Sequence, residues 1–427
     1  MRMTSSSEPI TLAVIGAGER SECYLAAFEK YYPGQYRVVA VADPDKAKQA
    51  DYQKRYGIPD SMVFDGYASI IKEKRLADVA ILATLDDMHY VPAIALIEAG
   101  YDMILEKPIA ISLEESIAIG EAARRHPDQL VAVCHVLRFT PFFRTIKQII
   151  DSKELGEVID IQHNENVGYF HFAHSYVRGN WRNTRDSAPF IVAKCCHDMD
   201  ILLYLLGDKH CKSLSSFGEL SFFNEAHYDE TTMAPRCIDC PREKECPFDC
   251  VRIYKVPMIA TVPLDCSSPE AIQKTFSTSP YGRCVFHSDN NVPDHQVVAM
   301  EFEGGVTASF NVSAFTKYTE RTIKVMCEYG EIRGRGNTNE IEVIRWDSDE
   351  IKTIKIPASE IEGGHDGGDE GFVRDFMDCY GSSKGFASRI ELSIESHVMA
   401  FASELSRLES GKSIDIQQLW REKAEER

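Results

Sequence analysis

The sequence has 427 residues, of which 44% are hydrophobic and 26% are charged, and these are ordinary proportions for a globular protein. They exclude collagen-like, low-complexity and wholly disordered chains, and the length suggests two or three domains. The 47 basic and 66 acidic residues give a formal charge of −19. Because nucleic acid and anionic membranes attract positive surfaces, we expect neither as the main partner. This negative net charge is more compatible with a small-molecule substrate than with nucleic acid or a membrane surface.

The first nine residues contain no apolar signal segment, and no apolar run approaches the roughly 18 residues of a membrane span. We therefore expect a cytoplasmic protein. In that compartment, the 13 cysteines are expected to be reduced thiols or metal ligands rather than disulfides.

In the first third of the chain, short apolar runs alternate with helical patterns. Short apolar strands between helices are typical of a parallel sheet buried on both faces, in a doubly wound α/β domain. The expected strands cover 10–15, 37–42, 78–83, 102–105 and 130–134, and the expected helices cover 21–31, 44–56, 88–99 and 112–125.

The pattern changes after Pro141. Alternating segments there favour a mostly antiparallel sheet with one covered face, which gives an α+β domain. We expect two domains, 1–140 and 141–427, with a cysteine-rich insert at 233–252. The expected strands cover 157–167, 295–303, 306–315, 322–328 and 340–346, the expected helices cover 141–151, 190–206 and 389–409, and 361–371 is a glycine-rich loop.

The first expected strand runs into Gly16, Gly18 and Ser21 and then into a helix. Such a turn places backbone N–H groups and a helix N-terminus where they hold a pyrophosphate. Asp43 ends the next strand, where a carboxylate binds ribose hydroxyls and repels a 2′-phosphate, so NAD is favoured over NADP. A plain turn with an incidental aspartate is the alternative.

A second motif, Glu106-Lys107-Pro108, directly follows the expected strand 102–105. Ligands bind at the carboxyl ends of strands in open α/β sheets. A lysine held there could bond a substrate hydroxyl. Taken alone, Lys107 could equally be a surface lysine before a helix.

These motifs occur in an order that resembles the glucose-fructose oxidoreductase / inositol dehydrogenase / rhizopine catabolism (Gfo/Idh/MocA) family. The resemblance covers nearly the whole chain. It rests on the glycine turn, Asp43, ATLDDMHYVPAIALIEAG at 83–100, EKP at 106–108, HVLRFTP at 135–141 and KCCHDMDILLYLLG at 194–207.

This resemblance implies a Rossmann domain followed by an α+β domain with an open-faced sheet, and an active site between them. It also implies oxidation or reduction of a secondary hydroxyl of a sugar, glycoside or cyclitol with NAD(P), in a homodimer or homotetramer. Lys107 would be the active-site lysine, and His197 would exchange a proton with the reacting hydroxyl. The expected cofactor-binding residues are Gly16, Gly18, Glu19, Arg20, Asp43, Thr84, His89, Glu106 and Lys107.

On a helix, Lys194, His197 and Asp198 share one face, and Asp200 lies close enough to orient the His197 imidazole. Many family members have an aspartate four residues before this histidine, where this chain has Ala193. Because that aspartate is replaced, three residues are candidates for the general base. His197 is the first choice, Lys107 the second and Lys194 the third. A satisfied, partly buried histidine is the alternative.

Further polar residues could contact the substrate, although turn chemistry explains most of them equally well. Arg138 could bind a substrate oxygen or form an interdomain ion pair. The expected substrate-binding set is Arg138, Asn164, Trp181, Arg182, Asp200 and His295, and Asn166, Asp289, His365, Asp366 and Asp369 are weaker candidates.

The insert carries Cys237, Cys240, Cys246 and Cys250 within fourteen residues. Four thiolates at such spacing suit a tetrahedral structural zinc ion, without a part in redox chemistry. An iron–sulfur cluster, a labile disulfide and a reduced loop are the alternatives.

Two other functions remain compatible with the sequence. Some relatives oxidise a glycoside transiently, eliminate the aglycone and restore the hydride, so that they hydrolyse glycosides without net NADH. A non-catalytic NAD-binding regulator is the other, but the retention of Lys107, His197 and Asp200 speaks against it.

Overall fold

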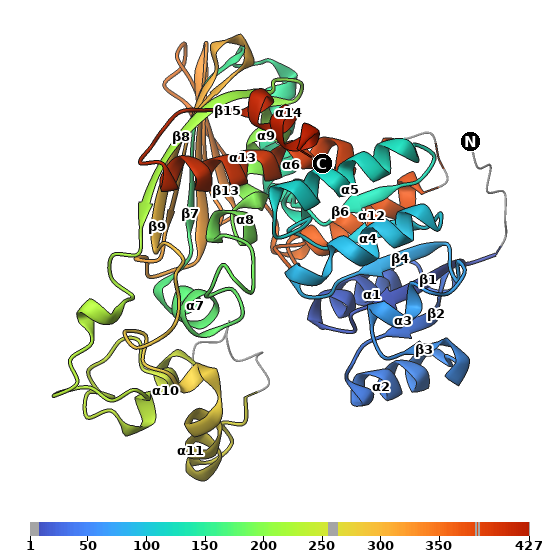
Figure 1. Cartoon of the computed structure of the whole chain (residues 1–427). Coiled ribbons are helices and arrows are strands. Elements are labelled where there is room, and N and C mark those ends of the chain that lie inside the picture. The colour runs from blue at the N-terminus through green and yellow to red at the C-terminus, as the bar shows by residue number, and fades with distance from the viewer. Residues whose placement is uncertain (1–7, 255–263, 381, 383–384, 427) are drawn as a thin grey trace.

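The computed structural model describes residues 8–254, 264–380, 382 and 385–426, arranged around two sheets (Figure 1). None of the helices in this described part has both the length and the apolar character that a bilayer span requires.

The first sheet is parallel, with strand order β3-β2-β1-β4-β5-β6. Its inner strands are buried because helices cover both faces, which confirms the doubly wound fold. Its strands are β1 (Ile10–Ile15), β2 (Tyr36–Ala42), β3 (Val63–Phe64), β4 (Val79–Leu82), β5 (Asp102–Leu105) and β6 (Val131–Val133). The helices of this region are α1 (Glu19–Tyr31), α2 (Lys46–Tyr56), α3 (Tyr67–Ile70), α4 (Tyr90–Glu98) and α5 (Leu113–Arg125).

The second sheet has the order β14-β13-β12-β11-β7-β10-β9-β8-β15. It is mixed, because β7 and β10 are parallel while the other neighbours are antiparallel. Its strands are β7 (Val158–Asn166), β8 (Cys211–Glu219), β9 (His295–Phe302), β10 (Thr307–Ser313), β11 (Glu320–Cys327), β12 (Gly330–Arg335), β13 (Glu340–Arg345), β14 (Ile351–Lys355) and β15 (Ile414–Asp415).

Helices cover the face of this sheet that is turned toward the first sheet, and the other face stays open (Figure 1). Phe217 and Ile159 on the open face are 57% and 52% exposed. The helices of the second region are α6 (Pro141–Ser152), α7 (Tyr169–Phe172), α8 (Phe190–Ala193), α9 (Cys196–Leu206), α10 (Cys250–Ile253), α11 (Pro269–Thr278), α12 (Gly368–Cys379), α13 (Ile390–Leu408) and α14 (Ile416–Glu425).

Helix α6 shows why these segments fold as they do. Thr140 caps it by accepting a hydrogen bond from the Phe143 N–H, and Pro141 begins it with a preset φ. Its apolar residues recur at helical spacing and are buried, namely Phe142, Phe143, Ile146, Ile149 and Ile150.

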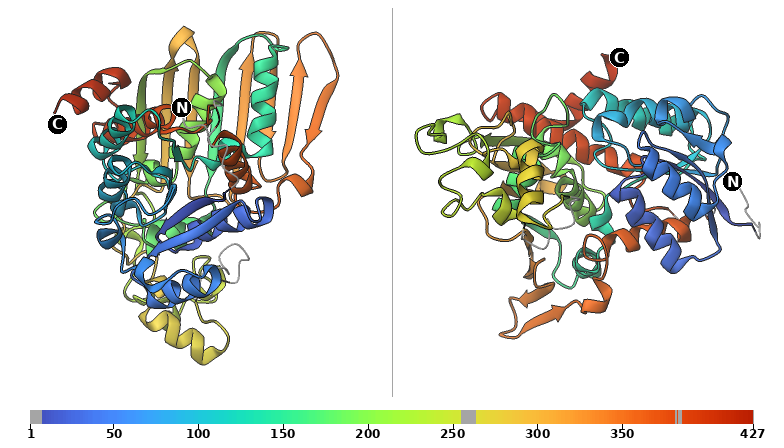
Figure 2. Two further views of the ribbon diagram at one scale, coloured as in Figure 1. Left: turned by 90° about the vertical axis from the view of Figure 1, so that its right-hand side faces the viewer. Right: turned by 90° about the horizontal axis from the view of Figure 1, so that it is seen from below.

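The end of the chain returns to the first sheet. Phe372 and Phe376 of α12 and Phe386 belong to the same buried cluster as Tyr24 and Phe28 of α1. Helix α13 packs on both α5 and α9, so it connects the two halves. The cysteine-rich insert and α11 extend beyond the end of the second sheet in both Figure 1 and Figure 2.

Candidate active site

The glycine turn lies between β1 and α1. Gly16 has a φ of 88°, and a Cβ there would lie 2.4 Å from the Ala83 carbonyl oxygen, so only glycine fits. Ser21, in place of the third glycine, is buried and donates to the Gly16 carbonyl oxygen. Gly18 begins α1 without a side-chain cap, and nothing lies within 4 Å of a Cβ placed on it. The start of α1 thus has no side-chain cap and has free space beside Gly18, which fits a pyrophosphate.

Asp43 is buried at the end of β2 and supports this turn. Its carboxylate accepts hydrogen bonds from the Ala17 and Asp45 N–H groups, each at 2.8 Å. A carboxylate has about four acceptor positions, so these two bonds leave capacity for ribose hydroxyls.

Glu106 is buried at the end of β5 and forms an ion pair with Arg20. Arg20 donates to Glu106 at 2.7 Å and makes a two-pronged ion pair with Asp369 of α12 at 2.8 and 3.0 Å. Burial favours a raised pKa for Glu106, but Arg20, Lys107 and the Tyr24 hydroxyl outweigh it and lower that pKa. Arg20 is thus occupied by carboxylates, and Glu19 beside it is exposed.

His89 and Thr84 lie in the connection after β4. His89 is fully buried, and its ring nitrogens contact the Pro108 oxygen at 2.8 Å and the Thr84 oxygen at 3.3 Å. The ring therefore holds the segment that carries Lys107. Thr84 bonds the Met88 carbonyl oxygen.

Lys107 and His197 meet where the two halves join. The Lys107 Nζ atom donates to the Ala193 carbonyl oxygen at 3.2 Å, just before α9. His197 is 5% exposed, and neither ring nitrogen has a hydrogen-bond partner among the described residues. Burial, followed by the charge of Lys107, lowers the pKa of His197 well below its usual value. The imidazole is thus neutral, which is the form that can accept a proton, and its lowered pKa also makes it a weaker base than an exposed histidine.

Lys194 is held by a buried charge network. Its Nζ atom lies 3.2 Å from Glu165 of β7, and Arg321 of β11 pairs with the same carboxylate at 2.7 Å. Arg321 also pairs at 2.7 Å with Asp198, which in turn bonds His163 at 2.8 Å. The network fixes the start of α9, and with it His197.

Arg138 and Asp200 form the ion pair that was one of the two alternatives for Arg138. Two bonds of 2.6 Å join them, and both are buried. Arg138 also donates to the Ala387 oxygen at 2.6 Å. The expectation that Asp200 orients His197 is wrong, because its carboxylate is bound to Arg138 and the His197 nitrogens have no described partner.

Three further residues of the expected substrate-binding set have partners within the chain. Asn164 is on the open face of β7, where it bonds Thr322 at 3.0 Å, because strand residues alternate and His163 and Glu165 take the covered face. His295 is 47% exposed at the start of β9 and bonds Asp294. Arg182 pairs with Asp289.

Trp181 does lie at the junction of the two halves. Its indole N–H donates at 2.9 Å to Asp86, in the connection between β4 and α4. Burial is the largest influence on Asp86 and raises its pKa, against a lowering influence from nearby Lys107. This bond brings the aromatic ring toward the lysine.

The structure brings one of the weaker candidates, His365, close to His197, and it adds one residue, His171, that the motifs did not identify. The His365 ring, from the glycine loop, is 6.0 Å from the His197 ring, and its Nδ1 lies 3.2 Å from Asp369. Burial, then Lys194, lowers the pKa of His171 well below its usual value. No local sequence signal distinguishes His171, whereas the dense glycines did mark the His365 loop.

The expected set of four zinc thiolates does not converge in the described structure. Cys237 and Cys250 come together with Asp249, whereas Cys240 and Cys246 lie outside that group. A hydrogen bond from Cys250 is the largest influence on Cys237 and lowers its pKa to about 6.

Comparison with known families gives two matches that together span most of the chain. The model described as "Oxidoreductase family, NAD-binding Rossmann fold" matches residues 10–135. The model described as "Oxidoreductase family, C-terminal alpha/beta domain" matches residues 147–393.

Individual relatives are more distant. A putative oxidoreductase, YteT, of Bacillus subtilis is 22% identical over 367 residues, which cover 80% of this chain and 82% of the relative. An inositol 2-dehydrogenase of Burkholderia lata is 29% identical over 203 residues, covering 47% of this chain and 56% of the relative.

Solved structures share the fold. An Agrobacterium radiobacter oxidoreductase, solved with NAD⁺, L-tartaric acid and magnesium, has a TM-score of 0.69 at 15% identity, over 96% of this chain and 99% of that one. A levoglucosan dehydrogenase solved with NADH has a TM-score of 0.68 at 17% identity, over 96% and 99% of the two chains.

Proposed function

Because the chain belongs to the Gfo/Idh/MocA oxidoreductase family, we propose that it uses NAD to oxidise or reduce a secondary hydroxyl of a sugar, glycoside or cyclitol. The observation that carries this proposal is the meeting of Lys107 and a neutral, unpartnered His197 at the carboxyl end of β5. A parallel sheet presents its ligand site at that end.

The glycine turn of Gly16 and Gly18, the α1 N-terminus and Asp43 would hold the cofactor, and the free space beside Gly18 at the start of α1 fits a pyrophosphate. When bound, NAD supplies the hydride acceptor. The negative charge of Asp43 at the end of β2 favours NAD over NADP.

Side chains of the protein would carry out the proton transfer and stabilise the developing charge. His197 takes the hydroxyl proton, because its imidazole is kept neutral by burial and by Lys107. Lys107 stabilises the negative charge that develops on the substrate oxygen. Lys194, the third candidate for the general base, is paired with Glu165.

Relatives whose names include inositol 2-dehydrogenase and levoglucosan dehydrogenase support a polyhydroxylated substrate. Trp181 supports it as well, since aromatic faces suit the apolar face of a sugar ring, and its bond to Asp86 holds it at the junction.

The test incubates the protein with NAD⁺ and a panel of sugars, cyclitols and aryl glycosides, and follows NADH absorbance and aglycone release together. We expect NADH without cleavage. Cleavage that requires NAD⁺ but accumulates no NADH would show the redox-neutral glycosidase reaction instead. NAD binding without any reaction across the panel would count against a polyol dehydrogenase.

We also propose a homodimer or homotetramer formed through the open face of the second sheet. Exposed Phe217 and Val297 are directly paired neighbours on this face, and both stay uncovered in the single chain. Exposed apolar side chains gathered on one face favour association. Light scattering should give at least twice the 48.1 kDa chain mass, and a charged residue at position 217 should lower it.

A further inference from the structure

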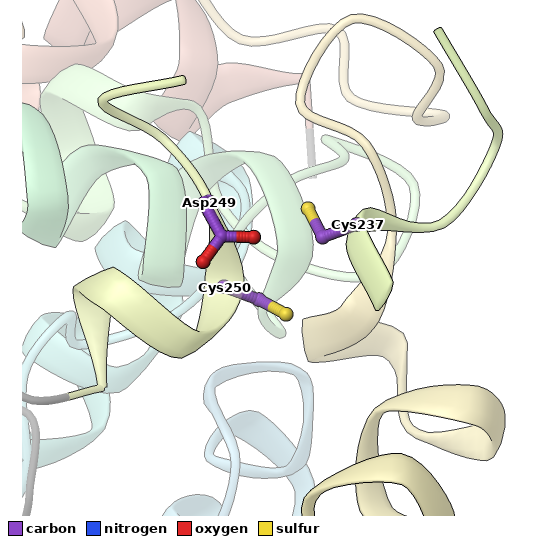
Figure 3. A group of neighbouring side chains, drawn as sticks. All are labelled: Cys237, Asp249 and Cys250. Carbon is purple, nitrogen blue, oxygen red and sulfur yellow. The ribbon is translucent and has the colours of Figure 1, made fainter. Parts of the chain in front are cut away.

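The cysteine-rich insert contains a buried cluster for which the proposed hydride transfer has no use. Cys237, Asp249 and Cys250 converge there, as Figure 3 shows. One ligand atom from each residue lies within 4.8 Å of the other two, and all three residues are buried. In a tetrahedral zinc site with bonds of roughly 2.0–2.3 Å, ligand atoms are separated by about 3.5–4 Å. The three side chains therefore need to move together by only about 1 Å or less to bind a zinc ion.

Local structure fixes the three ligands. Asp249 immediately precedes α10, and its Oδ1 accepts a hydrogen bond from the Arg252 N–H at 2.9 Å. Cys250 is the first residue of α10. Cys237 begins a short helical turn, Cys237–Asp239, that packs against α10.

A fourth thiol is available from the wall of a neighbouring cavity. This cavity has a volume of about 220 Å³, and Cys237, Cys240, Cys246, Cys284 and Asp249 contribute to its lining. Cys284 comes from a distant part of the chain, and its N–H donates to the Pro235 oxygen at 2.9 Å. That bond and the backbone bridge between Arg236 and Arg283 place Cys284 beside Cys237.

The charges of the cluster are complementary to a divalent cation. Arg178 is fully buried, and it donates to Cys237 Sγ at 3.2 Å and to the Phe248 oxygen at 2.8 Å. Once both cysteines lose their protons to bind a metal, two thiolates and one carboxylate beside one guanidinium carry a net charge of −2. A zinc ion neutralises it, whereas burying that charge uncompensated is costly.

We propose that this cluster is a structural zinc site, with Cys237, Asp249 and Cys250 as ligands and Cys246 or Cys284 as the fourth. The ion ties α10 to the Cys237 turn and so orders the insert. This site differs from the four-cysteine set expected from spacing, because Asp249 is a ligand and Cys240 and Cys246 both lie outside the group of three. It does not depend on the dehydrogenase activity.

The test measures metal content in the full-length protein purified under reducing conditions without chelator. We expect about one zinc ion per chain. Cys237→Ser and Cys250→Ser should lose the ion, whereas Cys266→Ser, at an exposed cysteine of the same region, should retain it. A mercurial reagent added to the wild-type protein should release the zinc into a colorimetric chelator, which gives a readout that needs no variant to fold.

Three results would overturn the site. One is a protein that stays metal-free after reconstitution with zinc. Another is iron with acid-labile sulfide in place of zinc. The third is a Cys237–Cys250 disulfide that forms in the native protein and persists in its mass spectrum.

Discussion

The Nζ atom of Lys107 lies 3.2 Å from the carbonyl oxygen of Ala193, and this hydrogen bond joins the end of β5 to the segment before α9. Lys107 belongs to the nucleotide-binding half, and Ala193 belongs to the half that carries His197. The bond therefore sets the distance between the lysine and the histidine. It uses the backbone at the position where many family members carry an aspartate, so this lysine is held without that side chain.

Replacing Lys107 with Met should lower kcat by about 100-fold or more, because the developing charge on the substrate oxygen loses its stabilising cation. The NAD dissociation constant, measured by calorimetry, should change little, since the glycine turn is intact. Lys212→Met, at an exposed position on β8, is the matched control. Turnover that survives Lys107→Met would refute this role.

Replacing His197 with Ala should lower kcat by about 10²–10⁴-fold, as expected for loss of a general base. Added imidazole should restore part of the activity. In the wild type, burial and Lys107 lower the pKa of His197, so its deprotonated form persists below pH 6.5. The pH profile of kcat should thus lack a histidine-like fall near pH 6.5, and a fall there that disappears in the variant would contradict the lowered pKa.

The two glycines of the turn should respond differently to alanine. At Gly18 a Cβ meets nothing within 4 Å of protein, so Gly18→Ala should leave the free energy of unfolding within about 0.5 kcal/mol of wild type and weaken NAD binding. At Gly16 the Cβ would collide with the Ala83 oxygen at positive φ, so Gly16→Ala should destabilise the fold itself. Denaturant unfolding and NAD titration separate the two effects.

The Arg138–Asp200 ion pair should matter far more to stability than the Arg182–Asp289 pair. Asp200→Asn removes the partner of a buried guanidinium and should cost about 3–5 kcal/mol. Asp289→Asn affects a carboxylate that is 45% exposed and should cost no more than about 1 kcal/mol. Urea unfolding of both variants tests this ranking, and equal effects would contradict it.

As the pH falls, the protein should lose stability at a higher pH than protonation of its carboxylates alone would cause. Burial, with the nearby His135, lowers the pKa of His397 to about 3. Below about pH 6.5, His397 is protonated in the unfolded chain but stays neutral in the folded chain. The free energy of unfolding therefore decreases as the pH falls from about 6.5 toward 3. Each such histidine contributes about 1 kcal/mol per pH unit.

Urea titrations between pH 7 and 5 measure this slope. His397→Gln keeps an acceptor for the Ile109 N–H, which donates to His397 at 2.9 Å, but removes the titrating group. The slope should become shallower in that variant. An unchanged slope would show that His397 is not responsible.

The sequence alone determined the parts of this protein that depend on neighbouring residues. Gly16, Gly18 and Asp43 follow strands whose apolar runs mark them directly, and Lys107 follows β5 in the same way. Strand ends of one parallel sheet meet at one edge, so local patterns were enough to gather these residues. The helix with His197 was likewise visible from its spacing, but the single helix expected over 190–206 is wrong. The segment forms α8 and α9, and Lys194 lies between them rather than on one helical face with His197.

Only the tertiary structure decided what each polar side chain binds. Asp200 lies three residues from His197, yet it pairs with Arg138. Both groups are buried away from water, and a buried guanidinium needs a carboxylate partner to offset the loss of its hydration. Asn164 lies on the open face of β7, which the sequence could not tell, because strand alternation is visible in sequence but the covered side is not. His365 and Cys284 join their clusters from distant segments. The glycines marked the His365 loop, but its contact with the His197 ring and the place of Cys284 depend on how the sheets and loops pack.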